Sequence, residues 1–172
     1  MKVILFSGKA ESGKTSAAEI LKKLLQAKGK KCIKIAYGDY VKQTAKMIHN
    51  WDGVKDEKGR ELLQWWGTNY VREKYPTFWV DTVLRLAPLL EEFYDYLLID
   101  DCRFPNEIEC WYNYETVKVR IERPYYENHL TQDQRKHPSE TSLDIYRYDA
   151  ILIARDLSTL ESKVEKVLLP IV

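Results

Sequence analysis

Two glycines and a lysine near the start of the chain have the spacing of a phosphate-binding loop. The stretch LFSGKAESGKTSAAEI places Gly8, Gly13, Lys14 and Thr15 in the pattern GxxxxGK[ST]. Glycines at these positions let backbone N–H groups turn inward around an anion, and the lysine reaches the β- and γ-phosphates of a nucleotide. The hydroxyl of Thr15 is a ligand for Mg²⁺ in such loops. The pattern therefore predicts a site for ATP and Mg²⁺.

The other residues of this loop extend the predicted nucleotide site. A helix that starts near Gly13 points the positive end of its dipole at the phosphates. Lys9 adds a second cation inside the loop, and a phosphate contact and a solvated side chain are equally compatible with its position. The residues predicted to bind the nucleotide are Gly8, Lys9, Ser12, Gly13, Lys14, Thr15 and Ser16.

A second set of charged residues follows a short apolar run in LLIDDCRFPNE. A carboxylate at the end of a buried strand can hold the hydration shell of magnesium, and both Asp100 and Asp101 are in that position. Neighbouring strand residues point to opposite faces, so only one of the two is expected to serve the metal. The other interpretation is that they cap a turn or a helix. Arg103 is placed for a bidentate phosphate contact, or for a salt bridge to Asp100, Asp101 or Glu107.

These groups must be positioned by elements that alternate along the chain. Apolar runs predict five strands, at Lys2–Phe6, Cys32–Tyr37, Tyr96–Asp100, Thr116–Glu122 and Ala150–Ala154. Helical spacing of apolar residues appears between them. The order predicts an α/β fold with a five-stranded parallel sheet and helices on both faces. Ligands of such sheets bind at the carboxyl ends of the strands, where the motifs described above fall.

Three helix starts are predicted from capping residues. Asp39 is expected to cap a helix that runs to about His49, and Ser158 in STLE is expected to open the last helix. In HPSE, we expect capping of the following helix through Ser139 and Glu140. A general base at His137 is the competing interpretation, although a phosphate acceptor that is already deprotonated near neutral pH needs none.

Composition narrows the class of protein. The 172 residues suffice for one domain, residues 1–172, and the formal net charge of +1 gives no bulk attraction to nucleic acid or to a membrane. The three cysteines form no CxxC pair, which argues against zinc and for reduced thiols in a cytoplasmic protein. The apolar run in MKVILFSG is too short for a signal peptide and is interpreted as a buried strand.

Among proteins with a phosphate-binding loop, a small kinase fits best. No NKxD-like motif is present, which argues against a regulatory GTPase, and motor or transport ATPases are usually larger. The segments SGKAESGKT, YGDYVK, LLQWWGTNYVRE, DCRFPNEIE, VRIERP and HPSETSLD resemble the deoxynucleoside monophosphate kinases of bacteriophages and their bacterial relatives. The resemblance extends from Val3 to about Leu160.

The resemblance implies ATP-dependent phosphorylation of a deoxynucleoside 5′-monophosphate. It implies a three-layer P-loop kinase fold with a helical substrate-binding insertion at about 39–95 and a lid at about 123–139. Asp101 matches the metal-binding aspartate of the DxR motif, beside Thr15. The residues that would act on the phosphates are Lys14, Arg72, Arg103, Arg123 and Arg135, and those that would bind the acceptor are Asp39, Lys42, Gln64, Arg72, Trp79 and Arg103.

Several alternatives stay open. A related small-molecule kinase such as a phosphomevalonate kinase also pairs an SGK-rich loop with a DxR motif, and a non-catalytic ATP-binding module would keep the loop alone. The aromatic residues around Trp66 and Trp79 are either core or a wall that stacks on the acceptor base. The family usually has an asparagine near the donor base where this chain has Ala154 and Arg155. The partners expected are small molecules, with the assembly state, monomer or homodimer, left open.

Overall fold

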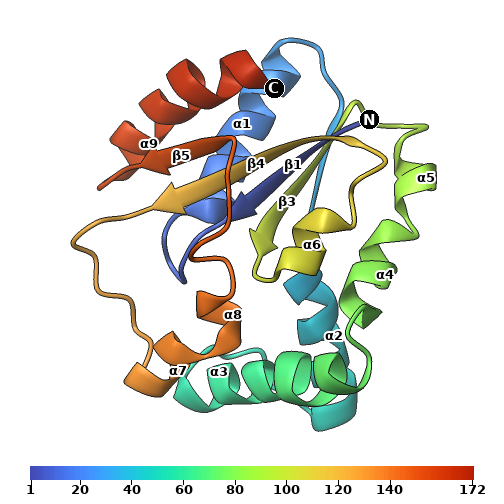
Figure 1. Ribbon diagram of the computed structural model, residues 1–172, viewed down its shortest axis with the longest axis vertical. Helices are drawn as coiled ribbons and strands as arrows, with labels where there is room; N and C mark the ends of the chain where they lie inside the picture. Colours follow the sequence, from blue (N-terminus) through green and yellow to red (C-terminus); the bar gives the residue numbers. More distant parts are fainter.

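Five parallel strands form the centre of the molecule in the order β2-β3-β1-β4-β5 (Figure 1). The computed structural model describes residues 1–172. The strands are β1 (Lys2–Ser7), β2 (Cys32–Ile35), β3 (Tyr96–Cys102), β4 (Glu115–Glu122) and β5 (Ala150–Ile153). In the central strand, Lys2 lies opposite Tyr96 of β3 on one side and Glu115 of β4 on the other. The predicted α/β fold with a five-stranded parallel sheet is confirmed.

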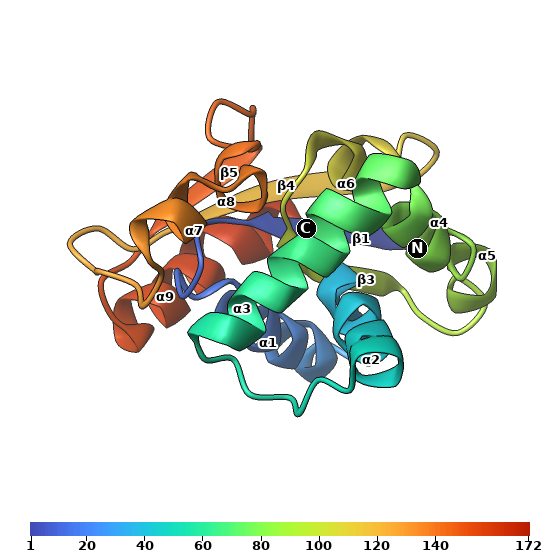
Figure 2. The ribbon, with the colours of Figure 1, turned by 90° about the horizontal axis from the view of Figure 1, so that it is seen from below.

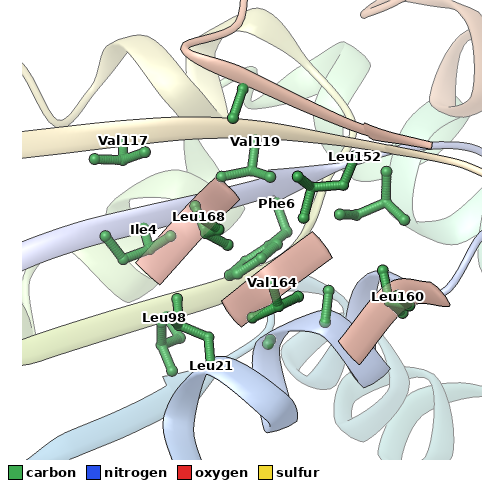
Figure 3. Close-up of a cluster of buried hydrophobic side chains, with 14 of the residues drawn as sticks. Ile4, Phe6, Leu21, Leu98, Val117, Val119, Leu152, Leu160, Val164 and Leu168 are labelled. Atoms are coloured by element: carbon green, nitrogen blue, oxygen red, sulfur yellow. The ribbon is translucent and has the colours of Figure 1, made fainter. Parts of the chain in front are cut away.

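Each face of the sheet has its own hydrophobic core. Strand side chains alternate between the faces, so β1 sends Ile4 and Phe6 to one side and Val3 and Leu5 to the other. The first core is closed by α1 (Lys14–Ala27), α9 (Leu157–Lys163), η2 (Val164–Leu168) and η3 (Leu169–Ile171). Figure 3 shows Phe6 and Leu21 within it, beside Val164 and Leu168. This core holds the helix of the phosphate-binding loop against the sheet.

Helices on the opposite face complete the three layers. They are α2 (Tyr37–His49), α4 (Phe78–Leu84), α5 (Ala87–Leu90) and α6 (Pro105–Glu109). Their buried residues include Tyr37, Val83 and Ile108, which pack on Leu5 and Ile99 of the sheet. The predicted three-layer arrangement is thereby confirmed. No helix of the structure is both long enough and apolar enough to cross a membrane.

The remaining helices lie beyond the carboxyl ends of the strands. They are α3 (Glu57–Gln64), which continues as the wider-turned η1 (Trp65–Arg72), and the short α7 (Gln132–Lys136) and α8 (Pro138–Thr141). Figure 2 shows α3 and α7 side by side on this end of the molecule. The side chain of Gln134 in α7 donates to the carbonyl oxygen of Glu57 in α3, at 3.4 Å. The ranges predicted as insertion and lid therefore meet over the strand ends.

The start of α2 differs from the prediction. The strand was expected to reach Tyr37 and the helix to begin after Asp39, but β2 ends at Ile35 and α2 begins at Tyr37. The carboxylate of Asp101 in β3 accepts hydrogen bonds from the backbone N–H groups of Tyr37 (2.9 Å) and Gly38 (2.7 Å). A residue distant in sequence therefore caps the helix, and Asp39 lies inside its first turn.

Two other caps refine the predicted boundaries. The cap of α9 is Asp156 rather than Ser158, because its side chain accepts from the N–H of Thr159 at 2.8 Å. For α8 the cap is not Ser139 or Glu140, which lie inside the helix, but the imidazole of His137. Its Nδ1 accepts from the N–H of Ser139 at 3.2 Å.

Candidate active site

The phosphate-binding loop joins β1 to α1 at the carboxyl edge of the sheet. Gly8 has φ +148°, and a Cβ atom there would lie 2.4 Å from the carbonyl oxygen of Ile121 in β4, so only glycine fits. Gly13, with φ +101°, turns the chain into α1. The ammonium of Lys14 folds back over the loop and donates to the carbonyl oxygens of Gly8 (2.9 Å) and Lys9 (2.7 Å). The loop thus has the shape of an anion cradle.

The electrostatics of the loop suit an anion. Burial, together with the nearby positive charge of Arg103, lowers the pKa of Lys14 to about 7. An anionic ligand would reverse this shift because it stabilises the charged ammonium. The hydroxyl of Ser12 is buried and has no hydrogen-bond partner. An unpartnered buried donor within such a loop fits a phosphate oxygen as its acceptor.

Two carboxylates lie near Thr15, and the structure distinguishes their surroundings. Both oxygens of Asp101 accept from the amides that start α2. Asp100 accepts from Lys34 through one oxygen, at 3.3 Å, and its other oxygen receives no hydrogen bond from the protein. Asp100 is therefore the freer carboxylate for a metal. The assignment of Asp101 to Mg²⁺ stays a prediction, and the geometry favours its neighbour.

The residues near Thr15 suit magnesium better than a metal held by protein alone. No group of three or more His, Cys, Asp and Glu side chains is arranged to hold a metal ion. Mg²⁺ is usually bound by one or two carboxylates together with water and substrate phosphates. One hydroxyl, Thr15, and one available carboxylate, Asp100, match that pattern.

One large cavity of about 700 Å³ joins the loop to the helical insertion. This volume is within the range of sites that enclose small molecules. The predicted site residues that line the cavity are Lys14, Thr15, Asp39, Lys42, Gln64, Arg72, Trp79, Asp101 and Arg103. The structure thus brings most of the predicted donor and acceptor residues together.

Arg72 is held at the cavity by the segment Phe104–Glu107. Its guanidinium is paired with the carboxylate of Glu107, donates to the side chain of Asn106 at 3.0 Å and lies 4.0 Å from the ring centre of Phe104. Its Nε is buried without a partner. Burial raises the pKa of Glu107 to about 7, although the positive charge of Arg72 opposes that shift. The FPNE motif therefore fixes this arginine and leaves one donor unused.

Arg103 is linked to the phosphate-binding loop through Glu140 of the HPSE segment. Its guanidinium is paired with one carboxylate oxygen of Glu140 and donates to the carbonyl of Ser139 at 3.3 Å. The second oxygen of Glu140 accepts from the backbone N–H of Ala10 in the loop, at 2.8 Å. Lys9 donates to the backbone oxygen of Glu140 at 2.7 Å. Glu140 thus sets the position of both the loop and Arg103.

Two predicted arginines lie outside the cavity. Arg123 donates to the carbonyl of Arg155 at 3.3 Å, with its guanidinium 3.9 Å from the ring centre of Tyr126. Arg135 donates to the side chain and backbone of Asn128. Both belong to the predicted lid, and their action on the phosphates stays a prediction.

Trp66 and Trp79, two aromatic residues of the insertion, belong to the core. Trp79 is 2% exposed, and its indole N–H donates to the carbonyl of Gly67 at 2.9 Å. Trp66 donates to the hydroxyl of Thr44 at 2.9 Å and packs in the same cluster. Core packing is therefore the better-supported of the two interpretations for Trp66 and Trp79, and of these two only Trp79 also lines the cavity.

The structure adds cavity residues that the sequence analysis missed. Lys34, Lys55, Arg60 and Glu140 line the cavity, and Arg60 pairs with Glu11 of the loop at 2.9 Å. In the sequence, Arg60 belongs to the charged run KDEKGRE, which is typical of a solvated segment, yet in the structure it lines the cavity. The only sign in the sequence that Arg60 could line a site was its position shortly before the hydrophobic run of the insertion. Its partner, Glu11, lies 49 residues away.

Comparisons with known proteins place the fold. No protein-family model matches the sequence, and no curated protein is similar to it in sequence. Among solved structures, the APS kinase CysC of Mycobacterium tuberculosis in complex with AMPPNP and APS aligns with a TM-score of 0.51 at 15% identity, covering 97% of this chain and 95% of that one. A single-residue variant of the same enzyme gives 0.50 at 16% identity, with coverage of 97% and 96%. The chain has the P-loop kinase fold.

Proposed function

We propose that the chain is a kinase that transfers the γ-phosphoryl group of ATP to a deoxynucleoside 5′-monophosphate. The observation that carries the proposal is one cavity lined by cations from two separate segments. Lys14 of the phosphate-binding loop and Arg72 at the end of η1 both line this cavity. Two polyanions repel each other, and cations on both sides are what their close approach requires.

The reaction needs little beyond this positioning. The bond between the γ-phosphorus and its bridging oxygen breaks, and a bond forms between that phosphorus and an oxygen of the acceptor phosphate. That oxygen is largely deprotonated near neutral pH, so no general base is needed. Lys14 would neutralise charge on the β- and γ-phosphates, and Arg103, which lines the same cavity, would neutralise charge on the transferring group. Mg²⁺, held near Thr15, would neutralise charge on the donor phosphates.

The segments that carry the family resemblance support a nucleotide acceptor. Arg72 closes GTxxxR, Arg103 and Glu107 belong to DxRFPNE, and Glu140 ends HPSE. These three segments are distant in sequence, yet all of them contribute to one wall of the cavity. Fold alone does not select an acceptor, because one fold serves many reactions. The APS bound in a structure of similar fold makes APS a necessary member of any acceptor panel.

The test is ADP formation from Mg·ATP with a panel of acceptors. The panel contains the four common deoxynucleoside monophosphates, their ribose forms, APS and phosphomevalonate. We expect turnover with at least one deoxynucleotide and a loss of at least about 100-fold in Lys14→Ala, since a removed transition-state cation costs several kcal/mol. Turnover only with APS or phosphomevalonate would reassign the acceptor. ATP binding without turnover on any acceptor would favour the non-catalytic module.

A second variant tests the acceptor wall. Arg72→Ala should raise the acceptor KM and lower kcat, because it removes a guanidinium that lines the cavity outside the phosphate-binding loop. Arg85→Ala is a matched control, since Arg85 is exposed at the end of α4 and contacts no acidic group. A change confined to the KM for ATP would contradict the assignment of Arg72 to the acceptor.

A further inference from the structure

Glu11 occupies an unusual position within the phosphate-binding loop. It is not glycine, yet its backbone has φ +62°, in the left-handed region that costs most residues about 1 kcal/mol. Its carboxylate contacts three residues from two separate segments. One oxygen pairs with Arg60 of α3 at 2.9 Å. The other accepts from the hydroxyl of Tyr126 at 3.1 Å and lies 2.9 Å from Nδ1 of His129.

Arg60 faces the same cavity as Lys14. Its Nη2 is the atom that contacts Glu11, and its Nε donates to the carbonyl of Lys55 at 3.2 Å. Lys55, which also lines the cavity, forms no ion pair with any acidic side chain, and burial together with the charges of Lys42 and Arg60 lowers its pKa. This corner of the cavity therefore carries more positive charge than the protein itself neutralises.

We propose that the Glu11 carboxylate takes the place of a phosphate group in the ligand-free protein, and that a nucleotide phosphate displaces it from Arg60. Arg60 is then a phosphate-binding residue, and Glu11 is an internal competitor. A carboxylate and a phosphate offer a guanidinium the same pair of anionic oxygens, so the exchange needs no new donor. The inference rests on the proposed kinase function, because it requires a phosphate ligand in this cavity.

The position of Glu11 makes the exchange local. Arg60 and Glu11 are each about a quarter exposed, with side-chain exposures of 24% and 26%, so both border open space in the cavity. When Arg60 leaves, Glu11 keeps Tyr126 and His129 as partners. The carboxylate is thus not left unpaired, and the loop stays attached to the segment that contains both aromatic residues.

The experiment is isothermal titration calorimetry with two separate ligands. The first is AMPPNP with Mg²⁺, which reports the donor phosphates, and the second is the deoxynucleoside monophosphate alone, which reports the acceptor phosphate. The variants are Arg60→Ala, Arg60→Lys, Glu11→Gln and the double variant Arg60→Ala/Glu11→Gln. Arg85→Ala and Glu161→Gln serve as exposed controls on α4 and α9. Thermal melts confirm that each variant is folded.

We expect Arg60→Ala to raise the Kd of one ligand by at least about 10-fold, the usual effect of one charge-assisted hydrogen bond. Arg60→Lys should lose less, and Glu11→Gln should lower the same Kd several-fold because the competitor has lost its charge. In the double variant, the Glu11 substitution should have no effect. The ligand whose Kd responds identifies the donor or the acceptor phosphate as the partner.

Three results would overturn the inference. The first is that Arg60→Ala binds both ligands with Kd values within about twofold of the wild type, while Lys14→Ala no longer binds AMPPNP. The kinase proposal would then survive, and only the role of Arg60 would be wrong. Another is Glu11→Gln tightening binding equally with and without Arg60, which would remove the competition. If the wild-type protein binds neither ligand, the proposed function and this inference both fail.

Discussion

Glu140→Gln is the substitution that most directly tests how the phosphate-binding loop is held. One carboxylate oxygen accepts from the N–H of Ala10 at 2.8 Å, and the other is paired with Arg103. The side chain of Glu140 is 6% exposed, so water does not replace either contact. Glutamine has the same shape but keeps only one acceptor oxygen. Its NH₂ group must face one of the two donors.

The magnitude follows from the contact that is lost. A hydrogen bond to a charged group contributes about 1.5–3 kcal/mol to stability. In a domain of this size, each kcal/mol lowers Tm by about 2–4 °C. We therefore expect a decrease in Tm of about 3–12 °C, measured by circular dichroism. Glu161→Gln on the exposed face of α9 should change Tm by less than about 2 °C.

A double-mutant cycle isolates the ion pair. Adding Arg103→Met to Glu140→Gln should cost less than the sum of the single substitutions, with a coupling of at least about 1 kcal/mol, because the two side chains are in direct contact. A decrease in Tm below about 2 °C for Glu140→Gln, with additive effects in the cycle, would refute the claim that Glu140 holds the loop.

Three further predictions follow from backbone geometry and from two shifted pKa values. Gly8→Ala should destabilise the protein by roughly 2–4 kcal/mol in urea unfolding, since the added Cβ would meet the Ile121 carbonyl at 2.4 Å. Gly29→Ala is the control: a Cβ there meets nothing within 4 Å, so the substitution should cost only about 1 kcal/mol. Equal costs for the two substitutions would contradict the steric reason. The folded pKa of Glu107 is about 7 against an ordinary value of 4.5, so its contribution to stability is complete below pH 4.5 and is lost as pH rises through 7. The contribution of Glu107 amounts to roughly 3 kcal/mol and should be missing when the free energy of unfolding of Glu107→Gln is measured against pH. Identical pH profiles for the variant and the wild type would refute the prediction. Because the pKa of Lys14 is about 7, its amine is mostly neutral at pH 8, and ATP binding at that pH should take up nearly one proton. The uptake can be measured by calorimetry in buffers of different ionisation enthalpy. Uptake that persists in Lys14→Ala would exclude this lysine as its source.

Local patterns predicted the frame of the molecule. The spacing of Gly8, Gly13 and Lys14 is contained within seven residues, and each strand is a short apolar run bounded by polar residues. Such signals do not depend on distant parts of the chain, so the order of strands and helices along the sequence could be derived from them. The parallel sheet followed because helices separate successive strands.

Contacts between distant segments could not be predicted in the same way. Asp39 has the residue type and position of a helix cap, but Asp101, which is 62 residues further along, reaches the amides of α2 first. Glu140 and Ala10 are 130 residues apart, and Glu11 and Arg60 are 49 residues apart. A charged residue pairs with whatever the fold brings near it, and one sequence carries no record of that proximity.

The central place of β1 has a consequence for synthesis. The first strand to leave the ribosome pairs with β3, which begins at Tyr96, and with β4, which begins at Glu115. At about 5–20 residues per second, roughly 5–20 s pass before β3 has been made. During this time the apolar residues of β1 have no neighbouring strand to pair with. The phosphate-binding loop is thus translated early, but its contact with Glu140 forms only after residue 140 has been translated and has reached Ala10.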